Sequence, residues 1–151
     1  LLDVGPADMA EAVERLQSQL KDAERELKSL RQMKLDMEAE QIVQFAEQIE
    51  EKWLITKTFD NRDAAELRAL ALKLRQYPHV VALIGAYDGK KLSLVAACAD
   101  DVELNANELL QDHLKPFGGR GGGDAFIAQG GCAADDIREL FLHTKEMVRN
   151  S

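Results

Sequence analysis

The sequence predicts an α/β (α+β) protein, with a long N-terminal coiled-coil helix followed by a small mixed sheet of about four strands covered by helices. Three observations predict this class. Apolar residues recur at helical spacing through the first third of the chain, and strand and helix patterns alternate through the rest. Seven of the ten glycines lie between Phe117 and Gly131. We therefore expect residues 1–51 to be a helix for dimerisation and linkage, and 52–151 to be a globular domain with a Gly-rich loop.

The predicted helix carries a heptad seam. Its apolar residues recur in alternating steps of four and three, as in a coiled coil. They are Met9, Val13, Leu16, Leu20, Ala23, Leu27 and Leu30. From Met33 to Trp53 the apolar residues form a broader stripe that suits packing on a globular body, so one helix is expected from about Ala7 to Glu51. The expected partner of the seam is a second copy of the chain. The alternatives are an upstream segment, the helix's own second half, or its own domain.

The first elements after the helix are a strand and a second helix. Residues 52–59 alternate apolar and polar side chains, which predicts a strand. Residues 61–77 have helical periodicity, and Asp60 or Asn61 is the expected N-cap. Pro78 ends this helix, because proline cannot continue it.

A hairpin and a short helix follow. The dipeptide Asp88-Gly89 is typical of a turn between two antiparallel strands. Residues 80–86 are almost continuously apolar, which predicts a central strand. Asn105 or Asn107 can cap the next helix, which is expected to continue through Leu114. After Pro116 come the glycine loop, a short strand at 126–129 and a final helix from about Ala134 to Val148.

Charge and composition exclude several classes of protein. The net charge is -8, and residues 1–51 carry 13 acidic and 6 basic side chains, against 14 and 13 in the rest. An acidic chain does not capture nucleic acid with its whole surface, so a polyanion needs a specific basic face. No apolar run approaches a membrane span, and we expect a cytoplasmic protein with reduced, structural Cys98 and Cys132. Because the chain begins with Leu1 and not methionine, we expect it to be part of a longer protein.

The glycine cluster is the main functional signal. An ordered glycine costs about 0.5–1 kcal/mol relative to alanine, so five within residues 118–123 need an explanation. One explanation is a tight crossover of the chain, and the other is a bare backbone that a phosphate or ribose can approach. Neither the P-loop nor the dinucleotide-binding pattern fits, because no lysine follows Gly123 and a helix precedes the cluster. The turn residues Lys90 and Lys91 become relevant if folding brings them beside Arg120. The predicted nucleic-acid-binding residues are Lys115, Gly118, Gly119, Arg120, Gly121, Gly122, Gly123, Gln129 and Gly130.

The segment GGRGGG, followed after four residues by AQGG, resembles the signature of the DHH-associated domain. This domain stands at the C-terminal end of alanyl-tRNA synthetases and of AlaX-type alanyl-tRNA editing proteins. The resemblance covers residues 52–148, including the order of strands and helices. The matching positions are Gly118, Gly119, Arg120, Gly121, Gly122, Gly123, Ala128, Gln129, Gly130 and Gly131. The phosphoesterase branch of the superfamily has a histidine after the glycines, where this chain has Asp124.

The resemblance implies a homodimeric module that binds alanine-specific tRNA, within a parent that aminoacylates this tRNA or hydrolyses its mischarged form. No catalytic site is expected in this chain, and the family's zinc belongs to a separate editing domain. His79, His113 and His143 share no ligand spacing, so no metal or other cofactor is expected here. Two alternatives remain, a purely structural oligomerisation domain and an accessory domain of a DHH-type phosphoesterase.

Overall fold

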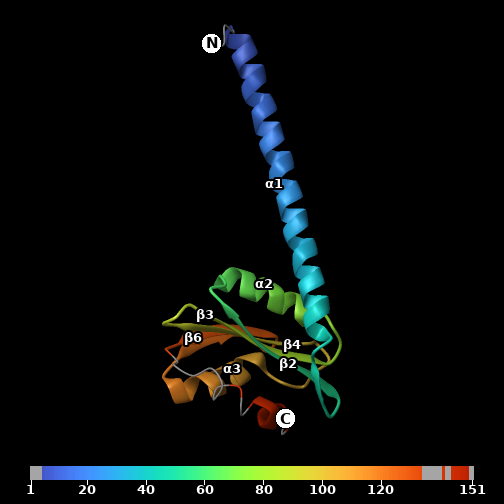
Figure 1. Ribbon diagram of the computed structural model, residues 1–151, viewed down its shortest axis with the longest axis vertical. Helices are drawn as coiled ribbons and strands as arrows, with labels where there is room; N and C mark the ends of the chain where they lie inside the picture. Colours follow the sequence, from blue (N-terminus) through green and yellow to red (C-terminus); the bar gives the residue numbers. More distant parts are fainter. Residues whose placement is uncertain (1–4, 134–140, 142–143, 150–151) are drawn as a thin grey trace. The chain divides into compact units, whose positions relative to one another are not determined.

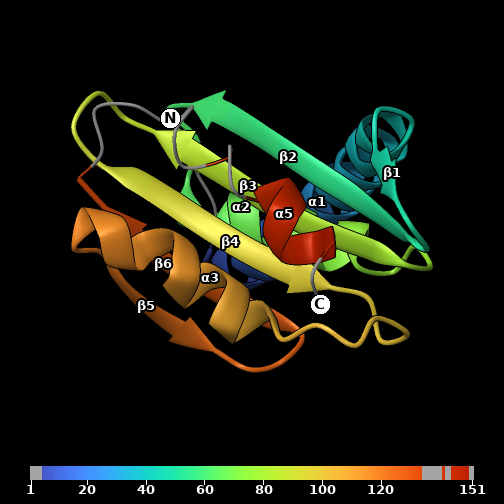
Figure 2. The same ribbon diagram turned by 90° about the horizontal axis from the view of Figure 1, so that it is seen from below.

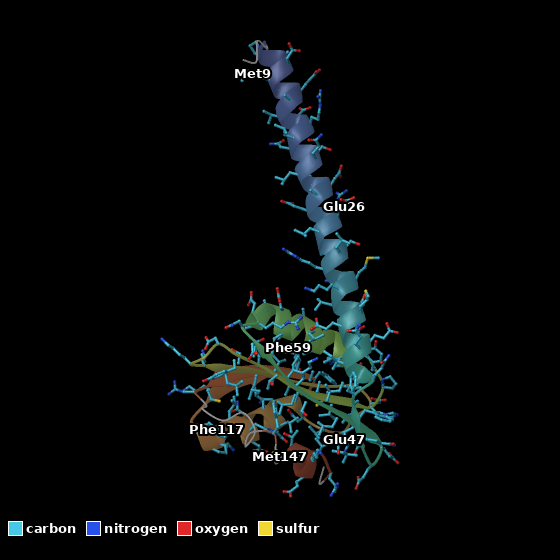
Figure 3. All side chains as sticks on the ribbon, in the orientation of Figure 1. Met9, Glu26, Glu47, Phe59, Phe117 and Met147 are labelled. Atoms are coloured by element: carbon cyan, nitrogen blue, oxygen red, sulfur yellow. The ribbon has the colours of Figure 1, made fainter. Side chains whose placement is uncertain are left out.

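The computed structural model describes residues 5–133, 141 and 144–149. The chain divides into two compact units, Leu1–Asp36 and Met37–Ser151. The described part of the first unit is almost entirely helix α1 (Pro6–Val43), whose last turns belong to the second unit. Residues 5–34 are exposed on all sides of this helix, and Figure 3 shows side chains projecting around it, Met9 and Glu26 among them. The large side chains of the predicted seam are 48% to 64% exposed, so this unit leaves the seam uncovered.

Helix α1 is shorter than the sequence predicted. It ends at Val43 and not at Glu51. The apolar stripe expected beyond Leu30 is only partly buried: Ile42 is in the core, whereas Met37 is 62% and Phe45 88% exposed. The chain then turns into a strand that the sequence did not predict.

The second unit is built on a six-stranded mixed sheet with the order β1-β2-β3-β4-β6-β5. Strands β2 and β3 are parallel, and all other neighbours are antiparallel. The strands are β1 (Glu47–Ile49), β2 (Lys52–Asp60), β3 (Val80–Tyr87), β4 (Leu92–Cys98), β5 (Arg120–Gly123) and β6 (Ile127–Cys132). The predicted mixed sheet is confirmed, and the count of about four strands is wrong, because β1 and β5 form the two edges.

Helices cover both faces of this sheet. Helix α2 (Ala64–Leu74) packs on one face, and α3 (Ala106–Leu114) and α5 (Thr144–Arg149) lie on the other (Figures 1 and 2). We call these the α2 face and the α3 face. The short 3-10 helix η1 (Lys115–Phe117) follows α3. Of the final helix expected at about 134–148, residues 134–140 and 142–143 lie outside the described residues.

The N-cap predicted from the sequence is correct for α3 and wrong for α2. Asn105 caps α3 as predicted, and its side chain accepts hydrogen bonds from two amides of the first turn. The predicted cap of α2 was wrong: Asp60 ends β2, Asn61 has a φ of 53°, and the cap is Asp63. The Asp63 carboxylate accepts from the Ala65 amide at 3.0 Å. All three are competent capping residues, so strand length decided between them.

Each face of the sheet has its own buried layer. Strand β3 is buried from Val80 to Ala86, which confirms it as a central strand. On the α2 face the layer is built on Leu67, Leu70 and Leu74. On the α3 face the side chains of β3 and β4 pack against α3, in a cluster that includes Leu83, Leu94 and Leu110. Apolar burial of this kind is the main source of stability of such a unit.

The end of α1 within the second unit is fastened by an ion pair. Both guanidinium NH groups of Arg62 reach the Glu38 carboxylate, and Arg62 also stacks on the Phe59 ring at 4.5 Å from its centroid. This pairing raises the pKa of Arg62 above its ordinary value, chiefly through its hydrogen bond to Glu38.

None of the helices in the described part of the chain combines the length and apolar character that a bilayer crossing needs.

Candidate nucleic-acid interface

The glycine-rich segment is an edge strand and not a loop. Residues Arg120–Gly123 form β5, which pairs antiparallel with β6, so the predicted loop is corrected. The register places Arg120 opposite Gly131, Gly121 opposite Gly130 and Gly122 opposite Gln129. Glycine is rare in strands, which is why its density indicated a loop. The two strands form a β5–β6 ribbon at one edge of the sheet.

On the α3 face the glycines of this ribbon are tightly packed. A Cβ on Gly121 would stand 2.6 Å from the Gly130 Cα, and one on Gly123 would stand 2.3 Å from the Ile127 oxygen. A Cβ on Gly130 would meet the Arg120 oxygen at 2.5 Å and a Leu114 methyl at 2.7 Å. No side chain fits at such distances without movement of backbone. These glycines are required for close packing of β5, β6 and α3.

Two other glycines have local reasons. Gly118 has a φ of 65° and caps η1 in the left-handed region, where glycine carries no steric penalty. Gly119 lies close to Leu114 and Cys132, so a side chain there would clash with both. The left-handed backbone expected of a tight crossover therefore occurs at Gly118, whereas the other crowded glycines are explained by close packing.

Gly122 is different. No heavy atom lies within 4 Å of the position that its Cβ would occupy, and its φ lies outside the left-handed region. It faces the same side as Gln129, its partner in the register, whose side-chain oxygen accepts from Arg68 of α2 at 3.1 Å. Gly122 is thus a bare and open point on the α2 face, and the fold of the described chain gives no reason for glycine there.

Cations from three elements stand on this α2 face. Directly opposed residues of a strand pair project to the same face, and so do alternate residues of one strand. Arg120 opposes Gly131, which alternates with Gln129, so Arg120 projects to the α2 face. The Lys91 side chain passes over Gly131, with its Cε 3.0 Å from the position of an added Cβ. We call Arg68, Lys91, Arg120 and Gln129, arranged around Gly122, the basic strip.

The cations of the basic strip lack an acidic partner within the described chain. Among those residues, no carboxylate forms an ion pair with Arg68, Lys91 or Arg120. The nearby Asp124 carboxylate accepts from the amides of Phe126 and Ile127 at 2.8 and 2.9 Å. These hydrogen bonds, the one from Ile127 foremost, lower the pKa of Asp124, with smaller contributions from the charges of Arg68 and Arg75.

The outer edge of β5 also exposes backbone groups. The Asp124 amide donates to the Ile127 carbonyl, so by alternation Gly122 and Gln129 form the next hydrogen-bonded pair, and the amides of Gly121 and Gly123 point away from β6. The Gly121 carbonyl accepts from the side chain of Gln111 on α3. Neither outward amide donates to a backbone acceptor among the described residues. Exposed edge amides are donors that suit a phosphate oxygen.

The structure brings together on one face only three of the nine predicted binding residues. Arg120, Gly122 and Gln129 share the α2 face, whereas Gly119, Gly121 and Gly130 face α3. Lys115 begins η1, directly after α3, with its amine 4.0 Å from Asp112. The seam residues from Met9 to Leu30 belong to the first unit.

Sequence reasoning missed Arg68 as a member of this site. A signal was present, because Arg68 and Arg75 are seven residues apart and lie on one side of α2, but no role was predicted for either arginine. Lys91 was expected to matter only if folding brought it beside Arg120. Its side chain passes over Gly131, which is the residue opposite Arg120 in the register.

His113 and both cysteines are buried, whereas His79 is exposed. The His113 ring is buried, with its nitrogens 2.7 Å from the Leu109 oxygen and 2.7 Å from the Thr144 hydroxyl. His79 pairs with Asp101, and His143 lies outside the described residues. Within the described ranges, no three His, Cys, Asp or Glu side chains gather as metal ligands. Both cysteines are free and buried, and burial raises the pKa of Cys98 to about 12.

A family model, curated relatives and solved structures all relate this chain to the same domain family. The model of the DHHA1 domain matches residues 50–150. Curated relatives include alanine--tRNA ligases of a Nocardioides species, 35% identical over 138 residues, and of Burkholderia cenocepacia, 29% identical over 133 residues. These alignments cover 86% of this chain and 15% of either ligase, so the chain corresponds to a small part of those proteins.

Two solved structures share the fold. The C-Ala domain of the Aquifex aeolicus alanyl-tRNA synthetase has a TM-score of 0.65 and 31% identity, over 69% of this chain and 97% of that one. RecJ from Thermus thermophilus has a TM-score of 0.62 over 84% of this chain and 19% of that one, and its 12% identity shows a shared fold alone. The chain therefore belongs to the DHHA1 domain family, and within it resembles the C-Ala domain of alanyl-tRNA synthetases.

Proposed function

We propose that this chain is the C-terminal module of a cytoplasmic alanyl-tRNA synthetase or alanyl-tRNA editing protein, and that it binds alanine-specific tRNA through the basic strip. The observation that carries the proposal is the open surface at Gly122, between cations that have no acidic partner among the described residues. A glycine without a packing role lets a sugar-phosphate chain approach the strand, while Arg68, Lys91 and Arg120 supply positive charge on a protein with a net charge of -8. The family relationship supports RNA as the polyanion.

The chemistry of the parent is assigned to parts of the protein outside this sequence. The basic strip contains no nucleophile with an adjacent base, so it suits binding and not catalysis. Aminoacylation or hydrolysis of mischarged tRNA, and any zinc used for editing, belong in this proposal to the other domains of the parent. The module holds the tRNA for them.

The binding proposal is tested by the triple variant R68A/K91A/R120A. Binding of an alanine-tRNA transcript is measured by fluorescence anisotropy across a salt series. Each phosphate contact that is lost lowers the slope of log K against log salt by about 0.7–0.9, so the variant, which removes three cations, is expected to lose about 2–3 units of slope. Its affinity at about 0.1 M salt should fall tenfold or more.

The matched control is R15A/K21A/R25A. It also removes two arginines and one lysine, but from positions of α1 outside the predicted seam. It should bind as the unaltered chain does. Equal losses in the two variants would mean that net charge, and not the basic strip, governs binding, and would reject the site. The single variants R120A and K115A compare the two predicted cationic contacts, and the geometry favours the larger loss for R120A.

We also propose that the chain is a homodimer through the α1 seam. Six apolar side chains of the seam are exposed in heptad register, and packing against the seam of a second copy would bury them. The variant L16D/L20D/L27D should be monomeric by sedimentation equilibrium. The control S18D/S29D/Q32D adds three aspartates to other sides of the helix and should remain dimeric. A monomeric unaltered chain would contradict this part of the proposal.

A purely structural oligomerisation domain is the competing function. It is favoured by the packing role of Gly121, Gly123 and Gly130. It predicts a dimer without measurable tRNA binding, so the anisotropy experiment separates the two.

A further inference from the structure

An exposed phenylalanine lies at the end of the β5–β6 ribbon. Phe126 precedes β6 in the turn after Asp124, and 46% of its surface is exposed. Leaving a large aromatic side chain in water forfeits much of the stabilisation that its burial would give. The turn itself does not require an aromatic side chain, because its hydrogen bonds use the Asp124 carboxylate and backbone groups.

The ring is mounted on a fastened backbone. The Phe126 amide donates to the Asp124 carboxylate at 2.8 Å, and the Phe126 carbonyl accepts from the Cys98 amide at 2.8 Å. A side chain on such a support is held ready for contact, and its ordering on binding costs little.

Arg75 supports the same ring. Its guanidinium lies 5.1 Å from the ring centroid, in the range of a cation–π contact. The guanidinium is itself fixed, because its Nε donates to the Cys98 carbonyl at 3.1 Å and an NH group pairs with Asp100. Arg75 is therefore already neutralised, and its role here is to position the ring and not to bind phosphate.

Phe126 and the basic strip are close along the sheet. Phe126 directly precedes Ile127, the first residue of β6, and Gln129 of the basic strip lies two residues further along this strand. Arg68 of α2 contacts Gln129 of β6, and Arg75, the C-cap of α2, contacts Phe126 just before β6. Cations at one end and an exposed aromatic ring at the other are the combination by which proteins hold nucleic acid whose bases are accessible.

We propose that Phe126, supported by Arg75, is a stacking platform for an accessible base of the RNA that lies on the basic strip. This inference rests on the proposed tRNA binding and adds a base contact to the phosphate contacts. An aromatic ring stacks on any base, so the platform contributes affinity without reading sequence.

The test uses three substitutions at Phe126 in the full chain with the alanine-tRNA transcript. F126L keeps an apolar side chain but removes the ring, and should weaken binding about fivefold or more. F126A should weaken it at least as much. F126W keeps a stacking ring and should bind as tightly as the unaltered chain. The slope of log K against log salt should be unchanged in all three, because no phosphate contact is lost.

A second readout identifies stacking directly. In F126W the new indole should lose fluorescence on RNA binding, beyond the change seen in the unaltered chain, which contains only Trp53. The matched control is F45A, which removes a phenylalanine that is 88% exposed and far along the chain from the ribbon. It should bind as the unaltered chain does. Thermal melts of F126L and F126W show whether the ribbon stays folded.

The outcomes separate this inference from the function on which it rests. If the unaltered chain does not bind the tRNA, both fail. If it binds, and R68A/K91A/R120A binds weakly while F126L binds normally, only the stacking platform is rejected. A loss of affinity in F126L that is accompanied by a lower salt slope, or that F126W does not restore, would also reject it.

Discussion

Glycine occurs on both faces of the β5–β6 ribbon, but for a different reason on each face. On the α3 face Gly121, Gly123 and Gly130 are glycine because backbone atoms fill the space of a side chain. On the α2 face Gly122 has open space, and cations from α2, the β3–β4 turn and β5 surround it. A run of glycines is thus not one signal. Packing explains the first set, and approach by a ligand is our explanation for Gly122.

The largest expected effect comes from filling the crowded face. Gly123→Ala places a methyl group against the Ile127 carbonyl, so β5 must move away from β6. Overpacking of this kind costs about 1–3 kcal/mol. Urea denaturation should show the loss as a lower midpoint with an unchanged slope. A Gly123→Ala protein as stable as the unaltered chain would contradict the packing explanation.

The reactivity of the Cys132 thiol is a second measure of packing on the α3 face. Cys132 is buried beside Gly119, and burial raises its pKa, so iodoacetamide should modify the folded protein slowly at pH 8. Gly119→Ala would push against the Cys132 side chain and should speed its alkylation several-fold, measured by mass spectrometry. Cys98, with its pKa near 12, is the internal reference and should remain unmodified. Equal acceleration at both cysteines would indicate global unfolding instead.

Acid should loosen the turn that joins the two strands. The pKa of Asp124 is lower in the folded chain than the value of about 3.9 in an unfolded one. Its contribution to stability is therefore complete above about pH 4 and is lost as the pH falls through the lowered folded pKa. Asp124→Asn keeps a side-chain oxygen but cannot titrate. Unfolding midpoints between pH 2 and 6 should fall less steeply for Asp124→Asn than for the unaltered chain.

The smallest expected change in stability is on the open face. Gly122→Ala meets no atom and needs no unusual φ, and it restricts the unfolded chain, so stability should be unchanged or rise by about 0.5 kcal/mol. The same methyl group stands where we propose that RNA approaches, so tRNA affinity should fall several-fold. Normal binding by Gly122→Ala would break the comparison, because Gly122 would then have no role on either face.

The sequence predicted what strong local signals determine. Strands β2 and β3, the Asp88-Gly89 hairpin and the Asn105 cap are confirmed, because periodicity, turn chemistry and capping act over a few residues. Strand β1 was missed since its hairpin turn is Glu50-Glu51, with Glu50 at a φ of 57°, which no sequence rule favours.

The candidate site was only partly predictable. The glycines and Arg120 were found from their spacing and family resemblance. Their division between two faces depends on register, and the approach of Arg68 and Lys91 depends on tertiary packing, neither of which local patterns encode. Phe126 was placed in a short strand, and its exposure became visible only with the fold.

The strand order has a consequence for folding kinetics. Three of the five strand pairings are hairpins, and the other two are bridged by α2 or by the α3 segment, so neighbours in space are close in sequence. Loop-closure entropy is correspondingly small for each step of assembly. The central β3–β4 hairpin can form first and recruit strands outward on both sides. We therefore expect the protein to refold after dilution from denaturant at the intermediate rates typical of mixed α/β domains.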